Sequence, residues 1–482
     1  MSHSRLRHFQ KHRLFWRMNT LLVLLLPSVL LAEEAPISTP LLDAIYHNDT
    51  AEVLILLEAG ADPHETNRFQ AQPIQYACLN GNLEILQALL EAGANPDSMG
   101  EGRIRPLMLA AKNGHPALVR ALLEAGVDPT DRDGEGQTAI LFACHEGHLE
   151  AVQLLHQAGA DPFDRIAKGK FDGFLLAARN GHTHVVAYLL NEAEGDPNHG
   201  IEVGGDGRAP KKGTSIMRLA MENGHFDTAA LLLQAGADPR DDADGFTALH
   251  ALTWIRKSAR GDTLTSLPPP KPTGTLSSLD FAKLLLDAGA DVDAQLGTRA
   301  KRSGSKGLRY EGSTPFLIAS RTADLPYMKF LIEEGANPTL ANAGGQTPLL
   351  ACVGVDLGPE SDEEATLPET YDAVAYLLRL GADVHAVDKR KNTVMHAAAH
   401  KQSPNLVHLL AQHGAQVEAW NVPNGRGNTP LRISRGYRPG NFKPSAPTEA
   451  ALTEVMLAAG ITPPPAPSRE EQKPTKGYPA DP

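Results

Sequence analysis

One landmark recurs along the 482-residue chain: two leucines, two further residues, and then Gly-Ala-Asp or a close variant. The first three spacings between its glycines are 33 residues, and every later spacing is 33 or more. A period that only grows indicates a fixed structural unit into which residues have been inserted, so we expect one array of repeats rather than several globular domains. The landmark glycines are Gly60, Gly93, Gly126, Gly159, Gly195, Gly236, Gly289, Gly335, Gly381, Gly414 and Gly460.

Each repeat is predicted to contain two short helices. In the opening Gln346-Thr347-Pro348-Leu349, the threonine can cap a helix and the proline fits its first position. In the third repeat, Asn113-Gly114-His115 separates a helix of small residues from a second helix with helical apolar spacing, and Gly126 can end that helix in a left-handed conformation. Neither helix is long enough to persist alone, so stability must come from stacking on neighbouring repeats.

These residues resemble the ankyrin-repeat consensus, which residues 245–250 and 107–128 match almost residue for residue. The resemblance implies an all-α ankyrin-repeat solenoid of about eleven helix-turn-helix units with β-hairpin fingers and several inserted loops, over residues 38–462. The last repeat is similar to that of some exported bacterial members of the family. Departures from the consensus at 171–174 and 192–195 predict a distorted fifth repeat. The family resemblance implies no enzymatic activity.

The inserted residues fall in two kinds of place. Residues 200–213 and 295–312 lie where the family has its finger loops, whereas 257–278, 354–371 and 438–448 lie between the two helices of one repeat. The finger insertions are mostly basic and the segment from Asp356 to Glu369 is acidic, a segregation that could steer an acidic partner to the fingers. The alternative is that both are solvated, partly disordered loops. Residues 463–482 are predicted to be a disordered, proline-rich tail.

Residues 1–32 are typical of a signal peptide, because a basic stretch precedes about twelve apolar residues, fewer than the roughly 20 that span a bilayer comfortably. Leu30 is large for a cleavage site after Ala32, so an uncleaved anchor is the alternative, as is a start at Met18. We expect export, to the periplasm or the medium. Removal of this segment would change the formal charge from −12 to −17, because it holds five basic residues and no acidic one. An acidic chain disfavours nucleic-acid binding.

Residues suited to chemistry are few. Each of Cys78, Cys144 and Cys352 occupies a small core position two or more repeats from the next, so we expect three buried thiols and no disulfide within the chain. The lysines near Gly213 precede the glycine instead of following it, which disfavours a phosphate loop. Residues 131–134 and 241–245 lack the glutamate of a calcium loop and are interpreted as hairpin turns. We expect no cofactor, no metal site and no enzymatic activity.

The nineteen histidines are explained mainly by the repeat. His250 and His396 stand three residues after Thr247 and Thr393, where each can form a reciprocal cap with its threonine. Within the repeats, only His396 and His400 have the i, i+4 spacing of helical metal ligands, and three alanines separate them with no glutamate. The histidines are therefore interpreted as structural.

The sequence favours a binding scaffold for a protein partner of unknown identity, with no nucleic acid and a membrane only if the N-terminal segment is uncleaved. The alternative is a secreted factor that binds a host or neighbouring-cell protein. Partner contacts are predicted at finger tips and on a concave face of first helices, where exposed aromatic and arginine side chains are the usual anchors. The candidates are Arg68, Phe69, Arg103, Arg132, Phe163, Arg165, Phe171, Trp254, Arg299, Arg302, Arg309, Tyr310 and Trp420, each of which could instead be an ordinary surface or packing residue.

Overall fold

The computed structural model describes residues 39–67, 70–166, 171–202, 212–242, 245–257, 272–298, 311–354, 365–436 and 444–465. Within these ranges the chain forms eleven consecutive pairs of helices, which confirms the all-α repeat architecture. Several predictions lie outside the described residues: the segment 1–32, the tail from 466, and most of each insertion. The same holds for six predicted contact residues, namely Arg68, Phe69, Arg299, Arg302, Arg309 and Tyr310.

The first helices of the pairs are α2 (Pro40–Tyr46), α4 (Pro73–Asn80), α6 (Pro106–Lys112), α8 (Ala139–Glu146), α10 (Gly173–Arg179), α12 (Ile216–Glu222), α14 (Ala248–Arg256), α16 (Pro315–Arg321), α18 (Pro348–Val353), α20 (Val394–His400) and α23 (Pro430–Ser434). The second helices are α3 (Thr50–Glu58), α5 (Leu83–Glu91), α7 (Pro116–Glu124), α9 (Leu149–Gln157), α11 (Thr183–Glu192), α13 (Phe226–Gln234), α15 (Ser278–Asp287), α17 (Leu325–Glu333), α19 (Leu367–Arg379), α21 (Pro404–Gln412) and α24 (Ala446–Ala458). Two short helices, η1 (Glu101–Arg103) and α22 (Val417–Trp420), lie in loops between pairs.

The helix starts follow the predicted chemistry. At α18 the hydroxyl of Thr347 accepts the Leu350 N–H, and Pro348 takes the first helical position. Thr39, Thr314 and Thr429 cap their helices in the same way. The threonine-proline opening is therefore a repeated helix start.

The helix ends also follow the prediction, with one informative exception. Ten of the eleven landmark glycines, Gly126 for example, have positive φ, where a Cβ would be strained. Gly195 does not, and Glu194 takes the left-handed conformation in its place with φ 57°. The second helix of the fifth repeat thus ends in a different cap, which confirms the distortion expected there.

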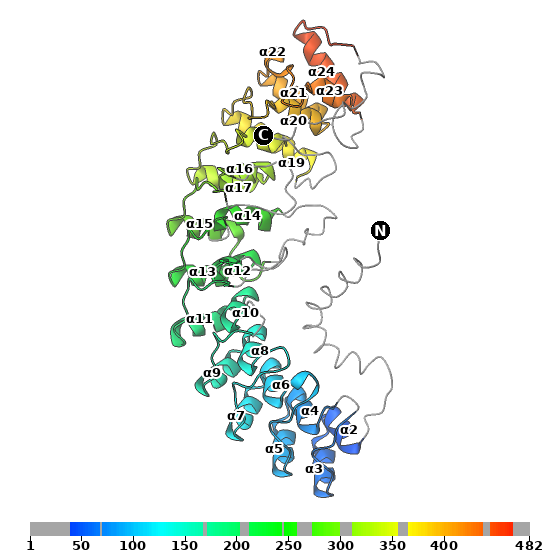
Figure 1. The fold of residues 1–482 in the computed structure, drawn as a ribbon, viewed down its shortest axis with the longest axis vertical. Coiled ribbons are helices and arrows are strands. Elements are labelled where there is room, and N and C mark those ends of the chain that lie inside the picture. Colours follow the sequence, from blue (N-terminus) through cyan, green and yellow to red (C-terminus); the bar gives the residue numbers. More distant parts are fainter. Residues whose placement is uncertain are drawn as a thin grey trace. The chain divides into compact units, whose positions relative to one another are not determined.

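The chain divides into two compact parts, and each is described separately. The N-terminal part comprises Met1–Ala143 and Glu150–Asp161, and the C-terminal part comprises Cys144–Leu149 and Pro162–Pro482. In the N-terminal part, α2, α4 and α6 pack in one row and α3, α5 and α7 in a second row. In the C-terminal part, the first helices from α10 to α23 form one continuous row beside the second helices (Figure 1). None of the helices in the described residues is long and apolar enough to cross a bilayer.

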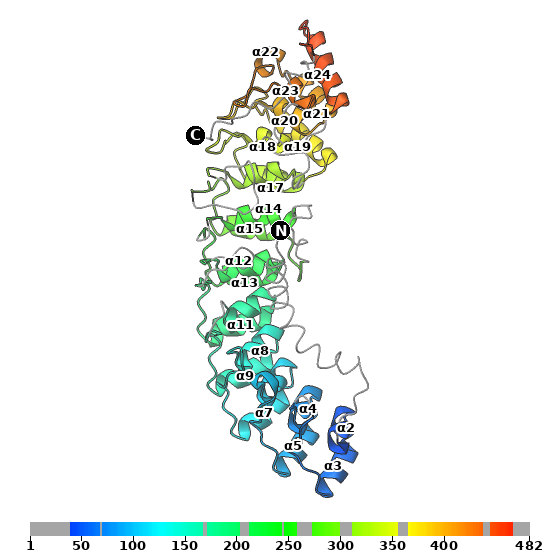
Figure 2. The same cartoon turned by 45° about the vertical axis from the view of Figure 1, so that its right-hand side comes forward.

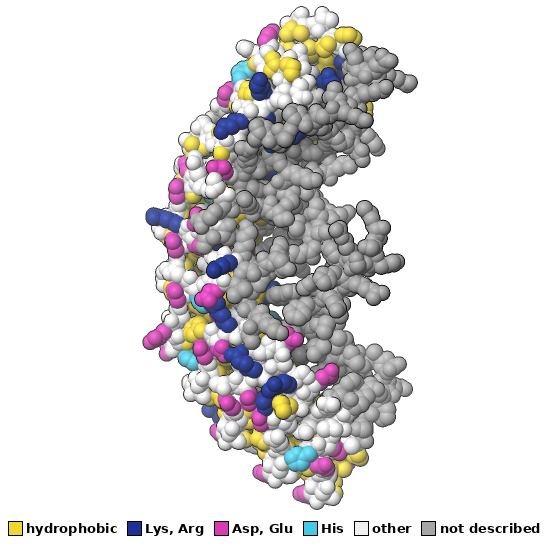
Figure 3. Space-filling view, viewed as in Figure 1, with side chains coloured by type: hydrophobic (Ala, Val, Ile, Leu, Met, Phe, Trp, Pro, Cys, Tyr) yellow, Lys and Arg dark blue, Asp and Glu magenta, His cyan; other side chains and the backbone are white. Residues whose placement is uncertain are grey.

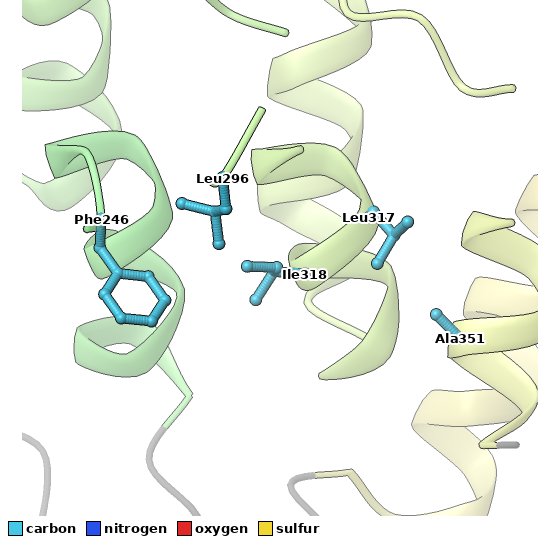
Figure 4. Close-up of a cluster of buried hydrophobic side chains, with 5 residues drawn as sticks. All are labelled: Phe246, Leu296, Leu317, Ile318 and Ala351. Atoms are coloured by element: carbon cyan, nitrogen blue, oxygen red, sulfur yellow. The ribbon is translucent and has the colours of Figure 1, made fainter. Parts of the chain in front are cut away.

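The core of the C-terminal part runs from repeat to repeat instead of closing within one. Figure 4 shows five buried side chains from three successive repeats, Phe246, Leu296, Leu317, Ile318 and Ala351, following one another along the row of first helices. Removing one repeat would expose the apolar face of the next, so each repeat depends on its neighbours.

The finger loops contain little β structure. Among the described residues, the β pairing is limited to two isolated bridges, Gly200 with Ser215 and Val387 with Thr393. The predicted β-hairpin fingers are therefore turn-closed loops, which lie along one edge of the C-terminal part in Figure 2.

The fifth repeat shows how its unusual opening is accommodated. Asp172 replaces the capping threonine and accepts the Leu175 N–H, and Gly173 stands where other repeats have proline, alanine, isoleucine or valine. A Cβ at Gly173 would lie 2.8 Å from the Pro162 carbonyl oxygen and 2.9 Å from Cys144 Sγ. The residue must be glycine because backbone and core approach it closely.

We expect Gly173→Ala to destabilise the C-terminal part by about 1–3 kcal/mol, since a methyl group would be forced into packed surroundings. Gly297→Ala is the control, because a Cβ there meets nothing within 4 Å. Thermal unfolding followed by circular dichroism should separate the two variants. Equal melting temperatures would contradict the close approach.

Candidate functional site

Four fingers are closed by a buried Asp or Asn. Asp133 Oδ1 accepts the backbone N–H groups of Glu135 and Gln137 at 2.9 and 2.7 Å. The turn predicted at residues 131–134 is thus present, and the structure places it at residues 133–136. Asn342, Asp388 and Asn424 make the equivalent pair of bonds in later fingers. The tips are thus held by side chains from within the same loop.

Successive fingers are also joined to each other. In the N-terminal part, the Gly134 N–H donates to the Gly102 carbonyl at 2.7 Å. In the C-terminal part, the Ala343 N–H donates to the Glu311 carbonyl at 2.8 Å and the Lys389 N–H to the Gly344 carbonyl at 3.0 Å. The Gly425 N–H donates to the Arg390 carbonyl at 2.7 Å. Within each part these fingers form a linked series, so their exposed side chains keep a fixed spacing.

The capping histidines connect the first helices to the fingers. His396 Nδ1 accepts from Thr393, which confirms the predicted cap, and its Nε2 donates to the Asn428 carbonyl of the next finger at 3.0 Å. His250 bonds to Thr247 and to the Ser313 carbonyl in the same way. Burial lowers the pKa of His396 to about 4 and that of His250 to about 3, so both rings are neutral at pH 7. The bond to the next finger was not predicted from the sequence.

Two other residue types occupy this position. Gln75 accepts from the Gln72 N–H and donates to the Ile104 carbonyl. Arg218, which is 2% exposed, donates to the Phe246 carbonyl at 2.6 Å and pairs with Glu222. Sequence reasoning missed both, although each stands three residues after its N-cap. In these four repeats the position holds a donor that reaches the next finger, whereas in others, such as those of Leu317 and Leu350, it holds an apolar side chain.

Four predicted contact residues lie in fingers or beside them and are at least partly accessible. Arg103 is exposed at η1, and Arg132 is half-exposed with its guanidinium donating to the Gly136 carbonyl. Arg165 pairs with Glu202 at 2.6 Å, and the half-buried Phe163 packs edge-on against Phe174. Arg103 and Arg132 lie on the two linked fingers of the N-terminal part, and Phe163 and Arg165 lie on one finger of the C-terminal part.

The expectation of exposure was wrong for two aromatic residues. Phe171 is 5% exposed and lies beneath the Arg179 guanidinium. Trp420 is buried, and its indole N–H donates to the Ala415 carbonyl. The sequence pattern places both residues in loops between helices. Each loop folds back on its repeat, because burial of an aromatic ring is favourable in free energy. Trp254 is half-buried and packs edge-on against Phe246 at 5.0 Å, so it too has a packing role.

The insertions predicted between the two helices of one repeat begin and end between those helices in the structure. The helix-helix insertion of the seventh repeat is tied back at its end, because Asp227 accepts the N–H groups of Thr275 and Leu276. Glu369 does not belong to a free acidic loop: it caps α19 through Thr366 and pairs with Lys257, which lowers its pKa to about 2. No local pattern indicates this ion pair, since its partners are 112 residues apart.

The three thiols are buried and unpaired, as predicted. Burial raises the pKa of all three, that of Cys352 to about 12, which leaves them as unreactive thiols. In the part of the chain that the structure describes, no group of three or more His, Cys, Asp or Glu side chains could hold a metal ion.

These features define a helical repeat protein whose linked loops carry the variable side chains. A family model described as ankyrin repeats (3 copies) matches residues 24–254 in overlapping segments and residues 365–438, more than half of the chain. The chain therefore belongs to the ankyrin-repeat family.

Curated relatives match this chain over part of its length. Human ankyrin repeat and SOCS box protein 16 is 29% identical over 233 residues, covering 46% of this chain and 47% of the relative. Human palmitoyltransferase ZDHHC13 is 31% identical over 45% of this chain and 32% of its own length. Dog inversin is 32% identical over 37% of this chain and 14% of its own length. The chain thus spans less than half the length of each of these relatives.

Proposed function

We propose that this chain is a non-enzymatic scaffold that binds a protein partner through its finger tips and the adjoining first helices. The observation that carries the proposal is the linkage of successive fingers by backbone hydrogen bonds within each part. A preformed series of loops loses little conformational entropy on binding, which favours affinity. The formal charge of −12 supports a protein rather than a nucleic acid as the partner.

The chain's own residues support a role without catalysis. Palmitoyltransferase ZDHHC13 is matched over 32% of its length, so its name describes a longer protein. A thioester or acyl-transfer step would need an accessible thiolate, whereas Cys78, Cys144 and Cys352 are buried with raised pKa values. We therefore do not extend that activity to this chain.

A site-directed cross-linking experiment tests the binding surface. Because the native cysteines are buried, a new cysteine can be labelled selectively with a photoactivatable maleimide. We expect Arg103→Cys, at an exposed finger, to give a discrete adduct with a protein in cell extracts, and Arg120→Cys, exposed on α7, to give none. Adducts of equal yield at both positions, or none at a finger, would contradict the proposal.

We propose export to the cell envelope, supported by the basic and apolar pattern of residues 1–32. The alternative is a secreted factor that binds a protein of a host or neighbouring cell. Fractionation of cells that produce the full chain tests both: recovery in the periplasmic extract supports the first, and recovery in the medium supports the second. Recovery in the cytosol alone would overturn export.

A further inference from the structure

The fingers that precede the last two repeats carry an unusual set of side chains. We call residues 386–392 and 421–428 the C-terminal finger pair. Val387 and Val422 are 51% and 41% exposed, although large apolar side chains are mostly buried in this protein. The exposed basic side chains beside them are Lys389, Lys391 and Arg426.

The two fingers are fixed to each other. The Gly425 N–H donates to the Arg390 carbonyl at 2.7 Å, and the Asn424 amide donates to Asn392 Oδ1 at 2.8 Å. Asn392 in turn donates to Asp388 Oδ2, so the buried amides form a continuous chain across both loops. The exposed side chains are therefore presented as one surface with a fixed spacing.

The charge of this surface is not balanced within the pair. Its one acid, Asp388, is 5% exposed, and its carboxylate accepts the N–H groups of Arg390 and Asn392. Fingers of the N-terminal part mix signs instead, with Glu101 close in sequence to Arg103 and Arg132 to Glu135. Exposed acids flank the pair at Asp383 and Glu418, outside both tips.

The space-filling view shows the surroundings of the last two repeats. On the face that Figure 3 shows, this end of the C-terminal part has Lys and Arg side chains beside hydrophobic ones. The full chain carries a formal charge of −12, so a basic and apolar surface is a local property. Exposed apolar residues next to unbalanced charge are typical of recognition sites.

We propose that the C-terminal finger pair binds an acidic peptide segment that carries apolar side chains. The partner's carboxylates pair with Lys389, Lys391 and Arg426, and its apolar side chain packs on Val387 and Val422. This inference rests on the proposed function and names the partner's chemistry. A nucleic acid fits less well, because the described finger pair exposes no aromatic ring on which bases could stack.

Fluorescence anisotropy on the purified full chain tests the inference. The probes are a labelled peptide of alternating glutamate and leucine, the same peptide with lysine for glutamate, and a single-stranded DNA of equal charge. We expect the acidic peptide to bind more tightly than the other two. Its affinity should fall as salt rises from 50 to 300 mM, because exposed charges are screened.

Two variants with matched charge changes locate the surface. Lys389→Glu with Arg426→Glu should weaken acidic-peptide binding about tenfold or more, since two attractions become repulsions. Arg120→Glu with Arg379→Glu, at exposed positions on second helices, should leave it within about twofold of wild type. Val387→Ser with Val422→Ser should weaken binding without changing its salt dependence. Circular dichroism would verify that each variant is folded.

Equal losses in both charge variants, or DNA binding as tight as peptide binding, would overturn the inference. The proposed function is tested by a different result, the cross-linking at the fingers. A finger adduct at residue 103 without any acidic-peptide binding would leave the scaffold in place and remove only the partner chemistry assigned here.

Discussion

Replacing Asp324 with serine should lower the free energy of unfolding of the C-terminal part by about 3–5 kcal/mol. Asp324 is 2% exposed and accepts two hydrogen bonds from the Arg256 guanidinium, at 2.7 and 3.0 Å. The pair joins the seventh repeat to the eighth. Without the carboxylate, the mostly buried Arg256 keeps its charge and loses its ionic partner, while its Nη1 retains the bond to Ser278 Oγ. Serine can retain the cap on α17, as Ser403 does on α21, so the loss reports the ion pair.

A double variant separates the pair from the rest of the site. Arg256→Met with Asp324→Ser should cost clearly less than Asp324→Ser alone, because the orphaned charge is gone. Urea unfolding can be followed by tryptophan fluorescence, to which Trp254 on α14 contributes. If the losses in the free energy of unfolding of the Arg256→Met and Asp324→Ser variants simply add in the double variant, the two residues are not coupled.

A second ion pair between the same repeats provides the control. Lys283 Nζ lies 2.9 Å from Glu334, but the lysine side chain is 48% exposed. Solvent screens such a pair, so Glu334→Ser should change the urea midpoint only marginally. The contrast between Asp324 and Glu334 would show that burial, rather than the presence of an ion pair, decides the effect.

The repeat could be predicted because its signals are local. A threonine before a proline, a glycine that accepts positive φ and the apolar spacing of α7 each act within a few residues. The same locality explains the correct placement of the histidine caps. The change at Gly195 was visible too, because the consensus there is strict enough for a departure to carry information.

The candidate site was harder to predict because it depends on contacts between repeats. Whether an aromatic residue in a loop is exposed depends on how that loop folds back, and Trp420 and Phe171 do so. The pairing of Lys257 with Glu369 spans three insertions of different lengths, which no repeat spacing determines. Val387 and Val422 follow a landmark position by sequence, and only the folded fingers show them exposed.

Acid should destabilise the C-terminal part through two buried histidines, His250 and His396. For a histidine whose pKa in the folded state is below its ordinary value near 6.5, the unfolded chain takes up a proton that the folded chain does not. The contribution of such a histidine to the free energy of unfolding is then fully present above pH 6.5. It falls as the pH is lowered toward the pKa of the folded state. His396 and His250 have folded pKa values of about 4 and about 3, so the loss continues through pH 5. Each histidine should lower the free energy of unfolding by up to about 2 kcal/mol between pH 6.5 and pH 5, at about 1.4 kcal/mol per pH unit.

Glutamine is the replacement that tests this, because Gln75 already fills the position in the second repeat and makes both bonds without a titrating group. Chemical unfolding at pH 7 and pH 5 should show that His250→Gln with His396→Gln retains up to about 4 kcal/mol that the wild type loses. His385→Gln, at an exposed residue of the same part, should behave as wild type. If the double variant loses stability as steeply as the wild type, protonation of other groups controls acid unfolding. The histidines would then matter only for the hydrogen bonds that join helix to finger.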